Sequence, residues 1–209
     1  MDADATDALT QHWDRVYQTK DETNVSWYQP RLETSLSLIK SVAPETSSAI
    51  IDVGGGSSTL VDSLIEAGYA DLTVLDISDP ALRLSRHRLA QKAQKVDWIV
   101  GDVTTWRPGR RYDLWHDRAV FHFLTEPERQ DAYLEVLDRA LGPGGHVVIA
   151  TFALDGPEQC SGLPIERYSA QTMALRFGPM FELVASESEL HETPTGARQS
   201  FVYTVLARR

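Results

Sequence analysis

The feature that most constrains this chain is a glycine-rich turn within the sequence IDVGGGSSTLVDSLIEAG, residues 51–68. A β-branched apolar run enters the turn, and an amphipathic segment of helical period leaves it. Gly54, Gly55 and Gly56 permit positive φ angles and let a ligand approach the backbone without meeting a Cβ atom. In doubly wound α/β folds this first strand-to-helix turn lies where ligands bind. We therefore expect a ligand against residues 54–56.

Short apolar runs alternate with amphipathic segments along most of the chain. Strands are expected at residues 49–53, 72–75, 96–100, 112–115 and 146–152. One intervening helix is expected to begin at Asp79-Pro80, with Asp79 as its N-cap. Two strand-like runs, FELVASESELHET and RQSFVYTVLARR, follow without a helix between them and predict an antiparallel hairpin. The prediction is an α/β fold: a Rossmann-like, doubly wound sheet of seven strands, mostly parallel, with a C-terminal antiparallel hairpin and helices on both faces.

Length and charge limit the classes of protein that fit. A chain of 209 residues is expected to form a single domain, 1–209, with a core at 45–209 and an appended polar segment at 1–30. The formal charge of −10 disfavours nucleic acid as a partner. Basic clusters at 83–88 and 107–111 fit solvated helix or loop faces.

The compartment is also constrained. One cysteine, Cys160, cannot form an internal disulfide. The chain begins without an apolar leader pattern, and no apolar run approaches the roughly 20 residues of a membrane span. We expect a cytoplasmic protein that does not bind membranes.

Two acidic residues near the glycines indicate the kind of ligand. Asp76 ends the next expected strand, twenty residues after Gly56, where a carboxylate can accept hydrogen bonds from both ribose hydroxyls. A dinucleotide fingerprint would have glycine where Thr59 stands, and a phosphate-loop lysine is missing. Asp52, just before the glycines, would repel a pyrophosphate but attract an ammonium group. The ligand expected is a nucleoside that carries an amino acid.

An ordered set of segments resembles the class I S-adenosylmethionine-dependent methyltransferases: IDVGGGSS, LTVLDIS, VGDVTTW, YDLWHDRAVFHFL and LGPGGHVVIATF, between residues 51 and 152. The resemblance implies S-adenosylmethionine as cofactor, S-adenosylhomocysteine as product, and no metal. It implies that Asp76, Ile77 and Ser78 hold the ribose, that Asp102 accepts the adenine amino hydrogen, and that Val103 packs on the ring. The full set of implied cofactor-binding residues is Trp13, Tyr17, Trp27, Tyr28, Asp52, Gly54, Gly55, Gly56, Ser57, Ser58, Asp76, Ile77, Ser78, Gly101, Asp102, Val103, Asp117 and Arg118.

Methyl transfer from a sulfonium requires alignment of the nucleophile and exclusion of water, so we expect a lid. The aromatic residues of segment 1–30 are the candidates, because their ring faces next to a cationic sulfur contribute about 0.5–2 kcal/mol each. The alternative is that these rings only pack on the edge of the sheet.

Two stretches are expected to line the acceptor side. The catalytic candidates are His116 and His122, which can take a proton near neutral pH, and Arg118, which can bind an anion or pair with Asp117. His122 is favoured. The substrate-binding candidates combine the lid, the turn and a Gly-Pro loop at 155–169: Tyr28, His122, Cys160, Leu163, Arg167 and Tyr168.

The Asp-Arg pair and the Gly-Pro loop resemble the thiopurine and tellurite methyltransferases, although Leu163-Pro164-Ile165 is less aromatic than their loop. The expected acceptor is a small thiol, sulfide or related chalcogen nucleophile, and the expected assembly is a monomer or homodimer. The alternatives are a protein lysine methyltransferase, whose W-D-x-x-Y-like start resembles HWDRVYQ, and an O- or N-methyltransferase of a small metabolite. A cofactor-binding sensor or accessory subunit is the non-enzymatic alternative.

Overall fold

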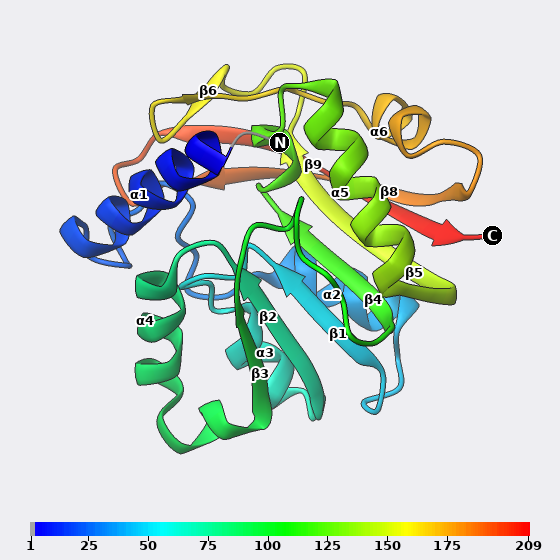
Figure 1. The fold of residues 1–209 in the computed structure, drawn as a ribbon, viewed down its shortest axis with the longest axis horizontal. Coiled ribbons are helices and arrows are strands. Elements are labelled where there is room, and N and C mark those ends of the chain that lie inside the picture. Colours follow the sequence, from blue (N-terminus) through cyan, green and yellow to red (C-terminus); the bar gives the residue numbers. More distant parts are fainter. Residues whose placement is uncertain (1–2) are drawn as a thin grey trace.

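The computed structural model describes residues 3–209, and helical segments separate most of its strands between residues 49 and 152 (Figure 1). The helices are α1 (Ala3–Thr19), α2 (Glu33–Val42), α3 (Leu60–Glu66), α4 (Asp79–Leu89), α5 (Pro127–Ala140) and α6 (Ala170–Phe177), with 3₁₀ segments η1 (Ala90–Lys95) and η2 (Phe121–Phe123). The strands are β1 (Ala49–Val53), β2 (Asp71–Asp76), β3 (Val96–Val100), β4 (Tyr112–Arg118), β5 (Leu141–Phe152), β6 (Gln159–Cys160), β7 (Leu163–Pro164), β8 (Phe181–Glu192) and β9 (Arg198–Arg208).

The main sheet has seven strands in the order β3-β2-β1-β4-β5-β9-β8. Strands β1 to β5 pair in parallel, whereas β9 is antiparallel to β5 and β8 is antiparallel to β9. The predicted Rossmann-like fold, with its C-terminal hairpin, is confirmed. The strand order reverses between β1 and β4, so this type of sheet opens a ligand crevice at their carboxyl ends.

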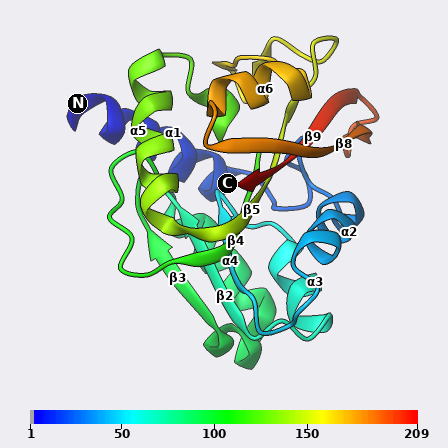
Figure 2. The same cartoon turned by 90° about the vertical axis from the view of Figure 1, so that its right-hand side faces the viewer.

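Helices lie on both faces of the sheet (Figure 2), and a cluster of buried hydrophobic residues packs on each face. Adjacent residues of β1 point to opposite faces, because side chains alternate along a strand. Ile50 belongs to the cluster that includes Leu36 of α2 and Leu64 of α3, and Ile51 belongs to the cluster that includes Leu137 of α5. The continuous apolar runs of the central strands are thus explained by burial on two sides.

The N-terminal segment is more ordered than its polar sequence indicates. Residues 3–19 form α1, which packs against α4 near the carboxyl ends of the strands (Figure 1). Asp14 accepts a hydrogen bond from the Ser78 hydroxyl (2.7 Å), and the Thr6 hydroxyl donates to Asp102 (3.3 Å). Helix α1 is therefore held by the same motifs that are expected to bind the cofactor.

Three local features differ from the sequence predictions. Ser78, not Asp79, is the N-cap of α4, because its hydroxyl reaches the Ala81 N–H. Helix α6 and the short hairpin β6–β7 are additional to the predicted elements: α6 is only eight residues long, and each hairpin strand has two residues. Within residues 3–209, none of the helices combines the length and apolar character that crossing a bilayer requires.

Candidate active site

Two adjoining cavities lie at the carboxyl ends of the central strands. The main cavity encloses about 900 Å³, its open mouth included, and the second encloses about 460 Å³. Both are lined by Gly54 and Arg118 and by the lid residues Tyr17 and Trp27. The predicted cofactor residues that line the main cavity are Trp13, Tyr17, Trp27, Gly54, Asp76, Ile77, Gly101, Asp102, Val103 and Arg118. Those that line the second are Tyr17, Trp27, Tyr28, Asp52, Gly54, Gly55, Ser57, Ser58 and Arg118.

The glycine turn is packed tightly by protein atoms. A Cβ atom on Gly54 would lie 2.0 Å from a methyl carbon of Val120, and one on Gly55 would lie 2.6 Å from Oδ2 of Asp52. Gly54 also has a φ of +68°, which other residues rarely adopt. The glycines therefore let carboxylates and the β4 turn approach the backbone, besides leaving room for a ligand.

Asp52 presents a free acceptor to the second cavity. Its Oδ1 lies 2.7 Å from Nδ1 of His116, while its buried Oδ2 has no hydrogen-bond partner among the residues that the structure describes. A buried carboxylate oxygen without a partner carries a free-energy cost, which an ammonium group removes. The residues present thus fit the amino-acid end of S-adenosylmethionine.

Asp76 faces the main cavity from the end of β2. Burial raises the pKa of its carboxyl group to about 7, and the neighbouring Asp52 and Asp14 also raise it. The Ser78 N–H donates to Asp76 Oδ1 at 2.8 Å. Ser78 does not line the cavity, because its hydroxyl is used by Asp14 of α1, so it orients Asp76 instead of contacting ribose.

Asp102 already accepts hydrogen bonds from the protein on both carboxylate oxygens. Oδ1 accepts from the N–H and the hydroxyl of Thr104 (2.8 and 2.7 Å), and Oδ2 accepts from Nη2 of Arg129 at 3.1 Å and from Thr6 at 3.3 Å. A carboxylate has about four acceptor positions. An adenine amino group can bind Asp102 only if a donor, such as the long contact from Thr6, gives way.

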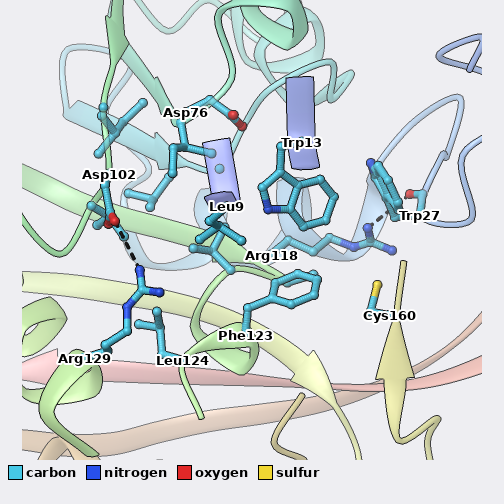
Figure 3. A pocket seen from close by; sticks show the side chains of 18 of the residues that line it. Leu9, Trp13, Trp27, Asp76, Asp102, Arg118, Phe123, Leu124, Arg129 and Cys160 are labelled. Carbon is cyan, nitrogen blue, oxygen red and sulfur yellow. Dashed lines mark hydrogen bonds and ion pairs between the residues drawn. The ribbon is translucent and has the colours of Figure 1, made fainter. Parts of the chain in front are cut away.

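The lid aromatics form one cluster over the cavities. Trp13 makes edge-to-face contacts with Trp27 and with Phe123 of η2, at centroid distances of 5.7 and 5.2 Å. Tyr17 lies 6.1 Å from Trp27. Figure 3 shows Asp76 and Asp102 at one side of the main cavity and Trp27, Cys160 and the end of Arg118 at the other, with Trp13 and Phe123 between them. The predicted ribose and adenine contacts lie on the side of Asp76 and Asp102, so we call the opposite side, around Arg118, the predicted acceptor end.

Arg118 is the cation of that end. Its Nε donates to the Tyr203 hydroxyl and its Nη1 donates to the Trp27 carbonyl, both at 3.2 Å. Nη2 has no hydrogen bond within the described chain and lies 3.7 Å from Glu189. The side chain is only 6% exposed and lies over the Phe201 ring, 4.5 Å from its centroid.

Asp117 does not pair with Arg118, and it lines neither cavity. It is fully buried, and it accepts hydrogen bonds from the Tyr133 hydroxyl (2.7 Å) and from the N–H groups of Val120 and Phe121. The predicted cofactor contact is therefore corrected: Asp117 holds the turn after β4, because consecutive strand residues point to opposite faces.

The two histidines lie away from the acceptor end. His116 lies between Asp52 and Ser35 under the glycine turn and lines only the second cavity. His122 is fully buried beside Phe123 and Phe152, and both its ring nitrogens lack partners among the described residues. Burial lowers the pKa of His122 to about 3. Neither histidine is placed to take a proton from an acceptor in the main cavity.

The Gly-Pro loop contributes one of its predicted residues. Cys160 lines the main cavity, but Leu163, Arg167 and Tyr168 do not. Arg167 binds the Gly156 carbonyl and Glu158 on the surface, and the Tyr168 hydroxyl is hydrogen-bonded to Glu166 and Gln130. Leu163 pairs with Cys160 across the β6–β7 hairpin but does not line the cavity itself.

Sequence reasoning missed Arg88 and the apolar wall of the main cavity. Arg88 is half-buried and donates to the Ser57 and Ser58 carbonyls at 3.1 and 2.7 Å, and it also binds Asp62 and Glu22. It therefore ties the glycine turn to α4 and to the N-terminal segment, contrary to the expected solvated face. The missed lining residues of the main cavity are Leu9, Val53, Leu75, Ala119, Val120, Phe123, Leu124, Arg129, Phe152, Gln199 and Phe201. No local pattern distinguishes them from core or surface residues.

The described residues contain no cluster of three His, Cys, Asp or Glu side chains suited to a metal ion. The α/β fold and the lining of the two cavities fit a nucleoside that carries an amino acid. Residues 50–145 match a family model described as a methyltransferase domain.

Among curated proteins, the eEF1A lysine and N-terminal methyltransferase of Bos taurus is 25% identical over 138 residues, which is 66% of this chain and 19% of that protein. The ubiquinone/menaquinone biosynthesis C-methyltransferase UbiE of Roseobacter denitrificans is 29% identical over 116 residues, 54% of this chain and 45% of that protein. The chain thus spans less than half the length of both relatives.

Solved structures share the fold. The Burkholderia thailandensis 1,6-didemethyltoxoflavin-N1-methyltransferase, with its acceptor and S-adenosylhomocysteine bound, superimposes with a TM-score of 0.75 at 18% identity, over 100% of this chain and 91% of that one. A structure titled for conversion of a disulfide bond into a thioacetal group during echinomycin biosynthesis gives 0.74 at 20% identity, over 96% and 91%. The methyltransferase-domain match, the curated relatives and the shared fold together support a class I S-adenosylmethionine-dependent methyltransferase, with S-adenosylmethionine as the cofactor.

Proposed function

We propose that this methyltransferase acts on a small, soft, anionic nucleophile, a thiol, sulfide or related chalcogen. The observation that carries the proposal is the buried Arg118 guanidinium at the acceptor end, whose Nη2 makes no hydrogen bond within the described chain and only a long ion pair, of 3.7 Å, with Glu189. A guanidinium favours the charged form of a neighbouring acid. It would therefore bind a thiol as its thiolate.

The chemistry of the lining residues supports the same class. At the acceptor end, aromatic rings surround Arg118 and Cys160, and burial raises the pKa of the Cys160 thiol to about 11, so that it stays protonated. Asp76 and Asp102 lie at the opposite side (Figure 3). A thiol ionises near pH 8.5 and needs little help from a base, whereas an alcohol would need a positioned base.

The protein's part in the reaction is binding, alignment and exclusion of water. S-adenosylmethionine, when bound, supplies an electrophilic methyl group on a sulfonium. Asp52 would hold the ammonium and Asp76 the ribose, while Trp13 and Trp27 close the cavity over them. Arg118 would hold the nucleophile in line, an arrangement that lowers the barrier by converting a bimolecular encounter into a positioned one.

The test is an acceptor panel with methyl-labelled S-adenosylmethionine, containing sulfide, small thiols, alcohols, amines and protein lysates, with products identified by mass spectrometry. S-methyl products are expected. Products methylated only on oxygen or nitrogen would overturn the proposal. Arg118→Leu should reduce kcat/KM for thiols by about 10²-fold, because removing a charged hydrogen-bond partner costs about 1.5–3 kcal/mol.

Methylation of protein amines is the second candidate, favoured by the similarity to the eEF1A lysine and N-terminal methyltransferase and by the HWDRVYQ start. The buried positive charge of Arg118 opposes it, since it repels an incoming ammonium group. Label on lysate proteins with none on thiols would support this candidate.

A further inference from the structure

A chain of buried polar side chains joins the two cavities through the interior of the protein. It begins at Asp52, whose Oδ1 lies 2.7 Å from His116 Nδ1, and continues from His116 Nε2 to the Ser35 hydroxyl at 3.0 Å. The hydroxyl oxygens of Ser35 and Tyr203 are 3.4 Å apart, and Arg118 Nε donates to the Tyr203 hydroxyl at 3.2 Å. The chain thus connects the free ammonium-binding carboxylate to the acceptor-end guanidinium.

Two members of the chain contact neither cavity. Ser35 lies on the apolar face of α2 with Leu36 and Ile39, and Tyr203 lies in the core of β9. Both are fully buried. A buried hydroxyl costs free energy unless it is hydrogen-bonded, and an apolar residue at Ser35 would suit this helix face. Neither contact with the cofactor nor packing of the core requires a hydroxyl group at Ser35 or Tyr203.

The hydrogen bonds of this chain meet at the Tyr203 hydroxyl oxygen. Arg118 Nε donates to it at 3.2 Å, and the Ser35 hydroxyl donates to it over a longer distance of 3.4 Å. His116 links Ser35 to Asp52 through its two ring nitrogens, at 3.0 and 2.7 Å. Polar groups in a buried network of this kind polarise one another, so a change at one end is felt along it.

We propose that His116, Ser35 and Tyr203 are positioning residues that couple the ammonium site at Asp52 to the orientation of Arg118. An ammonium on Asp52 Oδ2 fixes the carboxylate, the carboxylate fixes the His116 ring, and the ordered hydroxyls hold Arg118 Nε against Tyr203. The acceptor-binding geometry of Arg118 is thereby completed when the cofactor is bound. The role of Arg118 toward the acceptor rests on the proposed function, but the coupling itself does not. Coupling of this kind is reciprocal between the two sites.

The test follows the ¹⁵N–¹H resonance of the Arg118 Nε–H group, assigned by its loss in Arg118→Lys, while S-adenosylhomocysteine is added. The informative variant is Ser35→Ala, because this side chain touches neither cavity and alanine suits a helix. Tyr203→Phe keeps the ring and removes only the hydroxyl. The matched control is Thr204→Val, which removes a buried hydroxyl next to Tyr203 in β9 that has no partner among the described residues.

S-adenosylhomocysteine is expected to shift the resonance in the wild type and in Thr204→Val, and to shift it by less than half as much in Ser35→Ala and Tyr203→Phe. By calorimetry, Ser35→Ala should raise the Kd for S-adenosylhomocysteine about 3- to 10-fold, with Thr204→Val within twofold. A wild-type shift in Ser35→Ala, or an equal loss in Thr204→Val, would overturn the proposal. If no thiol in the acceptor panel is methylated, the proposed function is refuted. The coupling between Asp52 and Arg118 is still supported by the resonance shifts and the calorimetry.

Discussion

Asp76 shows how one residue's environment sets the behaviour of the site. Its pKa, raised to about 7 by burial and by neighbouring acids, lies far above that of an exposed aspartate. Only the ionised carboxylate can accept hydrogen bonds from both ribose hydroxyls. Cofactor binding should therefore depend on pH in the neutral range.

We expect the affinity for S-adenosylhomocysteine to fall as the pH is lowered from 8 to 6, since protonation removes an acceptor position from Asp76. Isothermal titration calorimetry at four pH values measures this. Asp76→Asn should weaken binding by about 1.5–3 kcal/mol and flatten the dependence. A wild-type affinity that is constant over this range would contradict the assignment.

His122 should affect acid stability. Its folded-state pKa, lowered to about 3, lies below the unfolded value of 6.5, so the unfolded chain binds the proton first. Stability from this group is complete above pH 6.5 and is lost as the pH falls toward 3. Relative to its value at pH 7.5, the free energy of unfolding should fall at pH 5 by about 2 kcal/mol more in the wild type than in His122→Phe. Urea denaturation of both proteins at the two pH values measures the difference, and equal losses would refute it.

At the scale of elements, α4 and the glycine turn are joined by Arg88. Because this guanidinium donates to two turn carbonyls and pairs with two acids, Arg88→Ala should lower the free energy of unfolding by about 1–3 kcal/mol. Arg83→Ala is the control on the same helix, since its ion pair with Asp79 is exposed and is worth about 0.3–0.5 kcal/mol. Urea denaturation compares the two variants, and losses of the same size would show that Arg88 has no special role.

Helix α1 should contribute to cofactor affinity through Trp13. Trp13→Ala removes a ring that lines the main cavity and contacts Trp27 and Phe123, so S-adenosylhomocysteine should bind about 1–2 kcal/mol more weakly. Leu175→Ala, at an exposed position of α6, should leave calorimetric affinity unchanged. If Trp13→Ala binds S-adenosylhomocysteine as tightly as the wild type, the aromatic residues of the N-terminal segment only pack on the sheet and do not contribute to cofactor binding.

For the whole molecule, the sequence alone determined the fold class, the cofactor and the strand positions. Apolar runs between amphipathic segments favour a parallel sheet that is covered on both faces. Gly54, Gly55, Asp52 and Asp76 line the two cavities as predicted, because they stand at strand ends, where ligands of such sheets bind. The tertiary structure alone decided the acceptor end. His122, Asp117 and Arg118 are close in sequence, yet only Arg118 lines the main cavity, because the other two are buried at the turn after β4. Gln199 and Phe201, which line the same cavity, lie near the C-terminal end of the chain. Side-chain direction at a turn and contact between distant segments depend on packing of the complete chain, which no local pattern encodes.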